Sequence, residues 1–109
     1  MTKREILPGM LDMLILKTLS LQPMHGYGIA RHLAHTSDDV IRIEEGSLYP
    51  ALQRMRQKGW IRSEWRRTPN GQRARYYEIT PEGRRQLGER ESAFDELMAA
   101  VRRIMRPAE

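Results

Sequence analysis

Cysteine is absent from the 109-residue chain, which excludes disulfides, thiolate zinc sites, iron–sulfur clusters and a cysteine nucleophile. Long apolar runs are absent too, since none approaches the roughly 20 residues that cross a bilayer. The first residues, 1–5, run into an acid rather than into the apolar core of a signal peptide. We therefore expect a cytoplasmic protein with no membrane partner, which depends on packing for its stability.

Motifs that support catalysis are also missing. The sequence has no glycine-rich phosphate loop, no nucleophile elbow and no pair of carboxylates at a catalytic spacing. Three histidines and two aspartates lie near one another and can be drawn as metal ligands: His25, His32, His35, Asp38 and Asp39. Histidines outside a ligand motif are more often solvated surface groups. We expect no enzyme activity, no metal and no cofactor.

Positive charge is present in excess, and it is gathered in one segment. Residues 54–75 contain eight arginines and lysines against the single acid Glu64, a local charge of +7, whereas the whole chain carries +5 and the remainder is therefore −2. Such clustering is typical of a surface that meets phosphate. The alternative is a solvated face that only keeps a small protein soluble.

The spacing of apolar residues predicts two short helices in the first third of the chain. Apolar side chains recur at helical spacing over residues 10–21. A second helix is predicted over residues 26–36, with Ile29 and Leu33 on its buried face. Residues 40–43 form a short apolar stretch that we expect to be extended and to lie over the core.

A third helix is predicted from Ser47 to Lys58. Ser47 serves as its N-cap, Pro50 falls in its first turn, and Gly59 suits the left-handed position after its end. Its inward face consists of Leu48, Leu52 and Met55. Its outward face consists of Pro50, Gln53, Arg54 and Gln57, with Tyr49 and Arg56 on one flank. Glutamine and arginine on an outward face suit contacts with base edges and phosphates, although an ordinary polar face would look the same.

A β-hairpin with an arginine-rich tip follows this helix. Side chains alternate between apolar and polar over residues 60–66 and again over residues 73–79, and Asn70-Gly71 between them is a strong turn signal. Ile61, Tyr77 and Ile79 are expected on the buried face. A basic two-stranded ribbon placed directly after a polar-faced helix predicts the wing of a winged helix.

A long helix is predicted to end the chain. Thr80 is its expected N-cap, Pro81 takes the first helical position, and Pro107 stops it. Its apolar seam, with Met10 and Leu14 of the first helix, is expected to mediate dimerisation: Leu87, Phe94, Leu97, Val101 and Ile104. The predicted fold is therefore mainly α with a small β-hairpin, a winged helix-turn-helix over 1–80 and a C-terminal dimerisation helix over 81–109, joined in one compact unit.

Four segments in this order also resemble the PadR family of bacterial transcriptional regulators. They are Pro23-Met24-His25-Gly26-Tyr27-Gly28-Ile29, Glu45-Gly46-Ser47-Leu48-Tyr49-Pro50-Ala51-Leu52, Gly59-Trp60-Ile61 and Tyr76-Tyr77-Glu78-Ile79-Thr80-Pro81-Glu82-Gly83. The resemblance runs from about residue 9 to residue 87, with Ser47 where threonine is common and Ile79 where leucine is common. The single helix after it is similar to the short subclass of the family. The resemblance implies a homodimer that binds an inverted-repeat operator, usually as a repressor released by a small-molecule effector.

The predicted winged helix assigns a role to each polar residue of the candidate DNA surface. The third helix is expected in the major groove, with Gln53, Arg54 and Gln57 on base edges and Ser47 and Tyr49 on phosphates. Phosphate or minor-groove contacts are expected from the wing residues Arg66, Arg67, Asn70, Gln72 and Arg73, and further phosphate contacts from His25 and Tyr27. Tyr27 has a structural alternative, since it can pack in the core. Arg75, a further cation of the wing, can pair with Glu64 across the hairpin.

Two other interpretations remain open at this stage. A winged-helix module can bind RNA or an acidic protein partner instead of operator DNA. The methionines, among them Met10, Met13, Met98 and Met105, are usually core residues, but their adaptable side chains can also line an effector site. Some family members hold flat aromatic drugs between tryptophans at the dimer interface, whereas the final helix here offers only Phe94, so no such drug pocket is expected.

Overall fold

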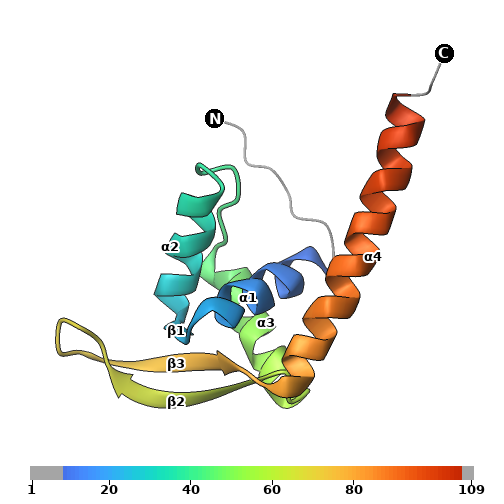
Figure 1. Ribbon diagram of the computed structural model, residues 1–109. Helices are drawn as coiled ribbons and strands as arrows, with labels where there is room; N and C mark the ends of the chain where they lie inside the picture. The colour runs from blue at the N-terminus through green and yellow to red at the C-terminus, as the bar shows by residue number, and fades with distance from the viewer. Residues whose placement is uncertain (1–8, 107–109) are drawn as a thin grey trace.

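The computed structural model describes residues 9–106, which form a mainly helical fold with a small antiparallel sheet of three strands (Figure 1). The elements follow one another as α1 (Met10–Leu21), β1 (Met24–His25), α2 (Gly26–Thr36), α3 (Glu45–Gln57), β2 (Ile61–Arg67), β3 (Arg73–Ile79) and α4 (Pro81–Met105). The predicted order of helices and hairpin is confirmed, and α1 and α2 have the predicted bounds.

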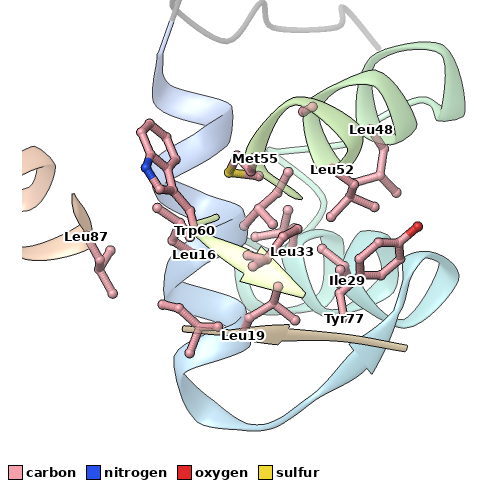
Figure 2. Packing of buried hydrophobic residues seen from close by; sticks show 14 residues of the cluster. Leu16, Leu19, Ile29, Leu33, Leu48, Leu52, Met55, Trp60, Tyr77 and Leu87 are labelled. Carbon is pink, nitrogen blue, oxygen red and sulfur yellow. The ribbon is translucent and has the colours of Figure 1, made fainter. Parts of the chain in front are cut away.

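One core of buried apolar side chains joins α1, α2, α3 and the sheet. Figure 2 shows Leu16, Ile29, Leu52 and Met55 meeting between the helices, and each of these side chains is 0% exposed. Helical spacing predicted the inward positions of Ile29 on α2 and of Leu52 and Met55 on α3, but not that of Leu16 on α1. Thr18 is buried with them, and its hydroxyl donates to the Leu14 carbonyl at 2.9 Å, so the polar atom is satisfied inside the core.

The apolar stretch before α3 departs from the prediction. Ile41 and Ile43 pack against the core, but Val40 is 54% exposed, and residues 41–44 form neither helix nor strand. The cause is the sharp turn before them, where Asp38 and Asp39 take positive φ angles of 52° and 63°. The chain therefore leaves Val40 at the surface.

Helix α3 begins two residues earlier than predicted. The N–H groups of Ser47 and Leu48 both donate to the carbonyl of Glu44 at 2.9 Å, so Glu44 is the N-cap and Ser47 lies within the first turn. The predicted N-cap at Ser47 was wrong, and Pro50 lies inside the helix beyond its first turn. The end of the helix is confirmed, because Gly59 follows it with a φ of +79°.

The sheet has the order β1-β3-β2, with both pairs antiparallel. In the predicted hairpin, Ile61 lies opposite Ile79, and Tyr77 lies opposite Ser63. The buried face of Ile61, Tyr77 and Ile79 is confirmed, with exposed fractions of 2%, 8% and 6%. Strand β1 was missed, because two residues are too few to show a period.

The start of α4 is fixed to the junction of α3 and β2. The Thr80 hydroxyl oxygen accepts the Gly83 N–H at 3.1 Å, which confirms the predicted N-cap, and the Thr80 N–H donates to the Trp60 carbonyl at 3.0 Å. Leu87 is only 8% exposed and belongs to the core (Figure 2), so its placement on an open dimerisation seam needs correction. The first turns of α4 pack on their own chain, and this contact covers Leu87. Pro107, expected to stop the helix, lies outside the described residues.

Candidate nucleic-acid interface

The outward face of α3 is polar and accessible. Pro50, Gln53 and Gln57 are exposed, and so is Ser47 in the first turn. The Gln53 Oε1 accepts a hydrogen bond from the Arg56 Nε at 3.2 Å. A side-chain amide donates and accepts at the same time, which is the combination that adenine presents in the major groove.

Arg54 is held at the edge of this face by a contact that the sequence analysis missed. Its Nη2 donates to the Oδ1 of Asp12 in α1 at 2.5 Å, and the Asp12 side chain is 8% exposed against 49% for Arg54. Leaving a nearly buried carboxylate unpaired costs at least about 1–3 kcal/mol. An arginine–guanine contact contributes about the same, 1–3 kcal/mol. Arg54 therefore gains little by leaving Asp12 for a base.

The N-terminus of α2 brings two predicted contact residues to the surface. The Nδ1 of His25 accepts the Gly28 N–H at 2.9 Å and so caps α2. The neutral imidazole therefore carries its proton on Nε2, which is the nitrogen able to donate to a phosphate. Tyr27 is 65% exposed, stacks near His25 with 6.4 Å between ring centroids, and lies 5.7 Å from the Arg31 guanidinium. The core alternative for Tyr27 was wrong.

Tyr49 connects α3 to this end of α2. Its side chain is 43% exposed, and its ring lies close against Gly26. A methyl group at Gly26 would come within 2.6 Å of the Tyr49 hydroxyl oxygen, so glycine is what allows the ring to lie there. The phenol is thereby held at the border between the two helices.

The wing ends in the predicted turn. Gly71 has a φ of +87°, its N–H donates to the Thr68 carbonyl at 2.9 Å, and Asn70 is exposed beside it. Arg67 donates from Nη1 to the Gly71 carbonyl at 3.1 Å, which directs its guanidinium along the turn. Arg66 forms an ion pair with Glu64 and is therefore partly neutralised. Gln72 and Arg73, which follow the turn, are exposed.

Trp65 is a surface residue that the sequence analysis did not assign. It is 56% exposed, and the guanidinium groups of Arg73 and Arg75 lie 5.3 Å and 5.7 Å from its ring centroid. Trp65 falls on the same side of β2 as Ile61, but the hairpin extends beyond the core at that point (Figure 1). Arg75 donates to the Ser63 hydroxyl at 2.9 Å, so the alternative pairing of Arg75 with Glu64 was wrong.

At the base of the wing, an ion pair with Arg62 keeps Glu78 ionised. Arg62 donates to Glu78 at 2.7 Å, and this hydrogen bond holds the pKa of the Glu78 carboxyl below its usual range. Burial raises the pKa of the neighbouring Tyr77 phenol, although Arg75 acts in the opposite direction. Glu78 of β3 therefore stays ionised and paired with Arg62, so its negative charge is compensated where an anion approaches the wing.

The wing, the start of α2 and Tyr49 of α3 border an open cleft of about 1060 Å³. Aromatic rings and guanidinium groups line it, namely Tyr27, Arg31, Tyr49, Trp65, Arg73 and Arg75. Within the described residues, no acidic side chain contributes to this lining. A cationic cleft with exposed rings suits a polyanion with sugar and base surfaces.

Known proteins share this arrangement. The model of the PadR-like family of transcriptional regulators matches residues 15–89. The chain belongs to the PadR-like family. A transcriptional regulator of Mycobacterium tuberculosis is 35% identical over 78 residues, which cover 72% of this chain and 69% of the relative.

Solved structures agree with the family assignment. A PadR family regulator from Eggerthella lenta is 33% identical with a TM-score of 0.78, covering 92% of this chain and 85% of its own. A transcriptional regulator from Clostridium thermocellum is 27% identical with a TM-score of 0.80, covering 87% and 92%. The resemblance predicted from the sequence is confirmed, and this PadR-like protein is a transcriptional regulator rather than an enzyme.

A second surface of this PadR-like regulator lies along α4. The C-terminal half of the helix extends away from the rest of the molecule (Figure 1), and Leu97, Val101 and Ile104 are 56%, 38% and 75% exposed. Phe94 is half-buried. Against α1, the helix borders an open cavity of about 220 Å³ lined by Met10, Met13, Arg90, Phe94, Leu97 and Met98. A neighbouring cavity of about 220 Å³ includes Leu14.

Residues 9–106 hold no candidate membrane-spanning helix and no candidate metal site. No helix of this part is long and apolar enough to cross a membrane. No group of three or more histidine, aspartate or glutamate side chains there comes together as a metal site. His35 borders Asp38 and Asp39, but the candidate ligands do not form such a group, and His25 instead caps α2.

Proposed function

We propose that this PadR-like regulator acts in the cytoplasm as a homodimeric repressor that binds an inverted-repeat operator in double-stranded DNA. The observation that carries the proposal is the continuity between the exposed polar face of α3 and the cationic cleft beside the wing. In this proposal, residues 1–80 carry the DNA-binding function, and residues 81–109 carry dimerisation through α4.

On DNA, α3 lies in the major groove. Gln53 and Gln57 take base edges, and Ser47 and Tyr49 take phosphates at the start of the contact. The wing follows the backbone, with Arg67, Asn70, Gln72, Arg73 and the partly neutralised Arg66 on phosphates or at the minor groove. The His25 Nε2 and Tyr27 add phosphate contacts at the start of α2.

The apolar row on α4 supports the dimer. Leu97, Val101 and Ile104 lie on one side of α4 and remain 38–75% exposed, although Leu97 also borders the cavity against α1. An exposed apolar row of this kind favours contact with another surface. A second copy offers the same row, and pairing the two helices holds two α3 helices at a fixed separation. Two-fold symmetric readers contact half-sites about 34–36 Å apart, one turn of DNA.

The methionine-lined cavity between α1 and α4 supports a small-molecule effector. Met10, Met13 and Met98 were predicted as adaptable residues, and the structure brings them together around a space of about 220 Å³ at the proposed dimer surface. A ligand there changes the distance between the two DNA-binding units and so releases the operator.

Footprinting on the DNA upstream of the regulator's own gene identifies the operator, and titration at about 150 mM salt then compares it with scrambled duplex and with RNA. We expect a large preference for the operator. Replacing Gln53 with Ala relaxes the preference at one base position, whereas Gln86→Ala on α4 leaves it unchanged. Equal affinity for scrambled duplex refutes operator recognition, and a preference for RNA favours the RNA-binding interpretation.

The dimer has its own test. We expect Ile104→Glu to convert the protein to a monomer in light scattering, because it places a charge in the apolar row. Ala99→Glu adds the same charge to the opposite side of α4 and is expected to leave the dimer intact. A wild-type chain that is monomeric at micromolar concentration contradicts the dimer, and so does an unchanged mass for Ile104→Glu.

A further inference from the structure

The ion pair of Asp12 and Arg54 connects two surfaces of the molecule. Asp12 lies in the first turn of α1, between Met10 and Met13, which face the cavity against α4. Arg54 lies in α3 next to Gln53. The two residues are 42 positions apart in the sequence, and their contact at 2.5 Å ties the helix that enters DNA to the helix at the proposed dimer surface.

The geometry of the pair leaves part of the guanidinium available. An arginine side chain has five N–H donors in a rigid planar fork. Within residues 9–106, Asp12 is the hydrogen-bond partner of Arg54, and it uses Nη2, while the Arg54 side chain remains 49% exposed. The other donors therefore face solvent at the edge of α3, and the backbone of a bound duplex passes beside the edges of a helix in its major groove.

We propose that Asp12 is a positioning residue, which holds Arg54 so that Arg54 contacts a backbone phosphate instead of reading a base. The nearly buried carboxylate restricts the guanidinium to one place, and this place sets how far α3 enters the groove. The inference deepens the proposed function and rests on it, because it requires α3 to lie in the major groove.

Two variants of Arg54 test the assignment to phosphate. We expect Arg54→Ala to weaken binding to the operator and to each single-base variant of it by the same factor, about fivefold per subunit at 0.15 M salt and so about 30-fold for the dimer, and to reduce the salt slope by about 0.9 per subunit, or about 1.8 for the dimer. Arg54→Lys keeps the charge but lacks the planar fork, so it restores the slope and only part of the affinity. A loss of preference confined to one operator position identifies Arg54 as a base reader and overturns the proposal.

Asp12→Asn tests the positioning role, since it preserves the volume and removes the charge. We expect a lower ratio of operator to random-duplex affinity, because the released arginine binds any phosphate. Asp38→Asn is the matched control: it makes the same change at an exposed position whose positive φ of 52° asparagine tolerates, and we expect the ratio to stay at the wild-type value.

A double-mutant comparison separates positioning from folding. In the Arg54→Ala background, Asp12→Asn is expected to leave the ratio unchanged, with thermal unfolding of every variant recorded in parallel. An equal effect of Asp12→Asn in both backgrounds shows that Asp12 acts through the fold and refutes the proposal. If Asp12→Asn does not fold, the two Arg54 variants decide. A wild-type protein without operator preference instead refutes the proposed function itself.

Discussion

Gly83 allows α4 to approach the sheet, and replacing it with alanine is expected to destabilise the whole molecule. An added Cβ would lie 2.0 Å from the Trp60 carbonyl oxygen and 2.8 Å from Ile79 Cγ1, whereas ordinary contacts begin at 3.4 Å. The backbone cannot rotate away, so α4 must shift and loosen the hydrogen bond from the Thr80 N–H to Trp60. Overpacking costs about 1–3 kcal/mol and a lost hydrogen bond about 1 kcal/mol, against about 1 kcal/mol gained in helix propensity.

The net expectation for Gly83→Ala is a loss of roughly 1–3 kcal/mol, or about 5–20 °C in Tm for a domain of this size. Denaturant and thermal unfolding at one fixed protein concentration measure it. Gly88→Ala is the matched control in the same helix, since a Cβ there meets nothing within 4 Å, and we expect a gain of roughly 0.5–1 kcal/mol. If both variants are stabilised equally, the close contact at Gly83 does not constrain α4 and the reasoning is refuted.

Three further predictions concern the proposed DNA surface. Replacing Arg67 with Ala is expected to weaken binding to all duplexes alike and to lower the salt slope by about 0.9 per subunit, or about 1.8 for the dimer; a change confined to one sequence would contradict this. Gly26→Ala is expected to displace the Tyr49 ring and to weaken operator binding as much as Tyr49→Ala does, with unfolding measured alongside. Arg62→Gln is expected to raise the pKa of Glu78 in an NMR titration. Because the pKa of Glu78 is lowered in the folded protein, the pair stabilises the protein above the ordinary carboxyl pKa, and this contribution is lost as pH falls through the folded pKa.

Features that repeat along the chain could be predicted from the sequence. The bounds of α1 and α2, the buried side of the hairpin and the Thr80 cap all follow from periodicity or from residues with a single local role. The start of α3 could not, because Glu45-Gly46 is typical of a turn, although an acid in the first turn of a helix is favourable. Strand β1 exists through its pairing with β3, which no local pattern records.

The candidate site shows the same division. The outward face of α3 follows from helical spacing, so Gln53 and Gln57 could be identified. The contact at the edge of α3 could not be predicted, since Arg54 and Asp12 are 42 positions apart in the sequence. Trp65 was missed because alternation predicts the side of a strand on which a residue lies, but not where the core beneath that strand ends.

Ion pairs with acidic residues determine how many of the eight arginines and lysines in residues 54–75 remain available to DNA. Of the eight in residues 54–75, Arg54, Arg62 and Arg66 pair with Asp12, Glu78 and Glu64. Of the other five, Arg56 donates to Gln53 and Lys58 lies over the Trp60 ring. The remaining three, the wing residues Arg67, Arg73 and Arg75, form no ion pair within residues 9–106 and are counted as phosphate contacts, with the exposed side of Arg54 as a fourth.

Three or four phosphate contacts per subunit therefore predict a salt slope of about −5 to −7 for a dimer on its operator, rather than the roughly −13 that a local charge of +7 on each subunit would give. Titration of operator binding between about 50 and 200 mM salt measures this slope. A value near −13 would mean that the ion pairs open on binding and that the acids do not restrict the interface, whereas a value in the lower range supports a contact limited to the wing and the edge of α3.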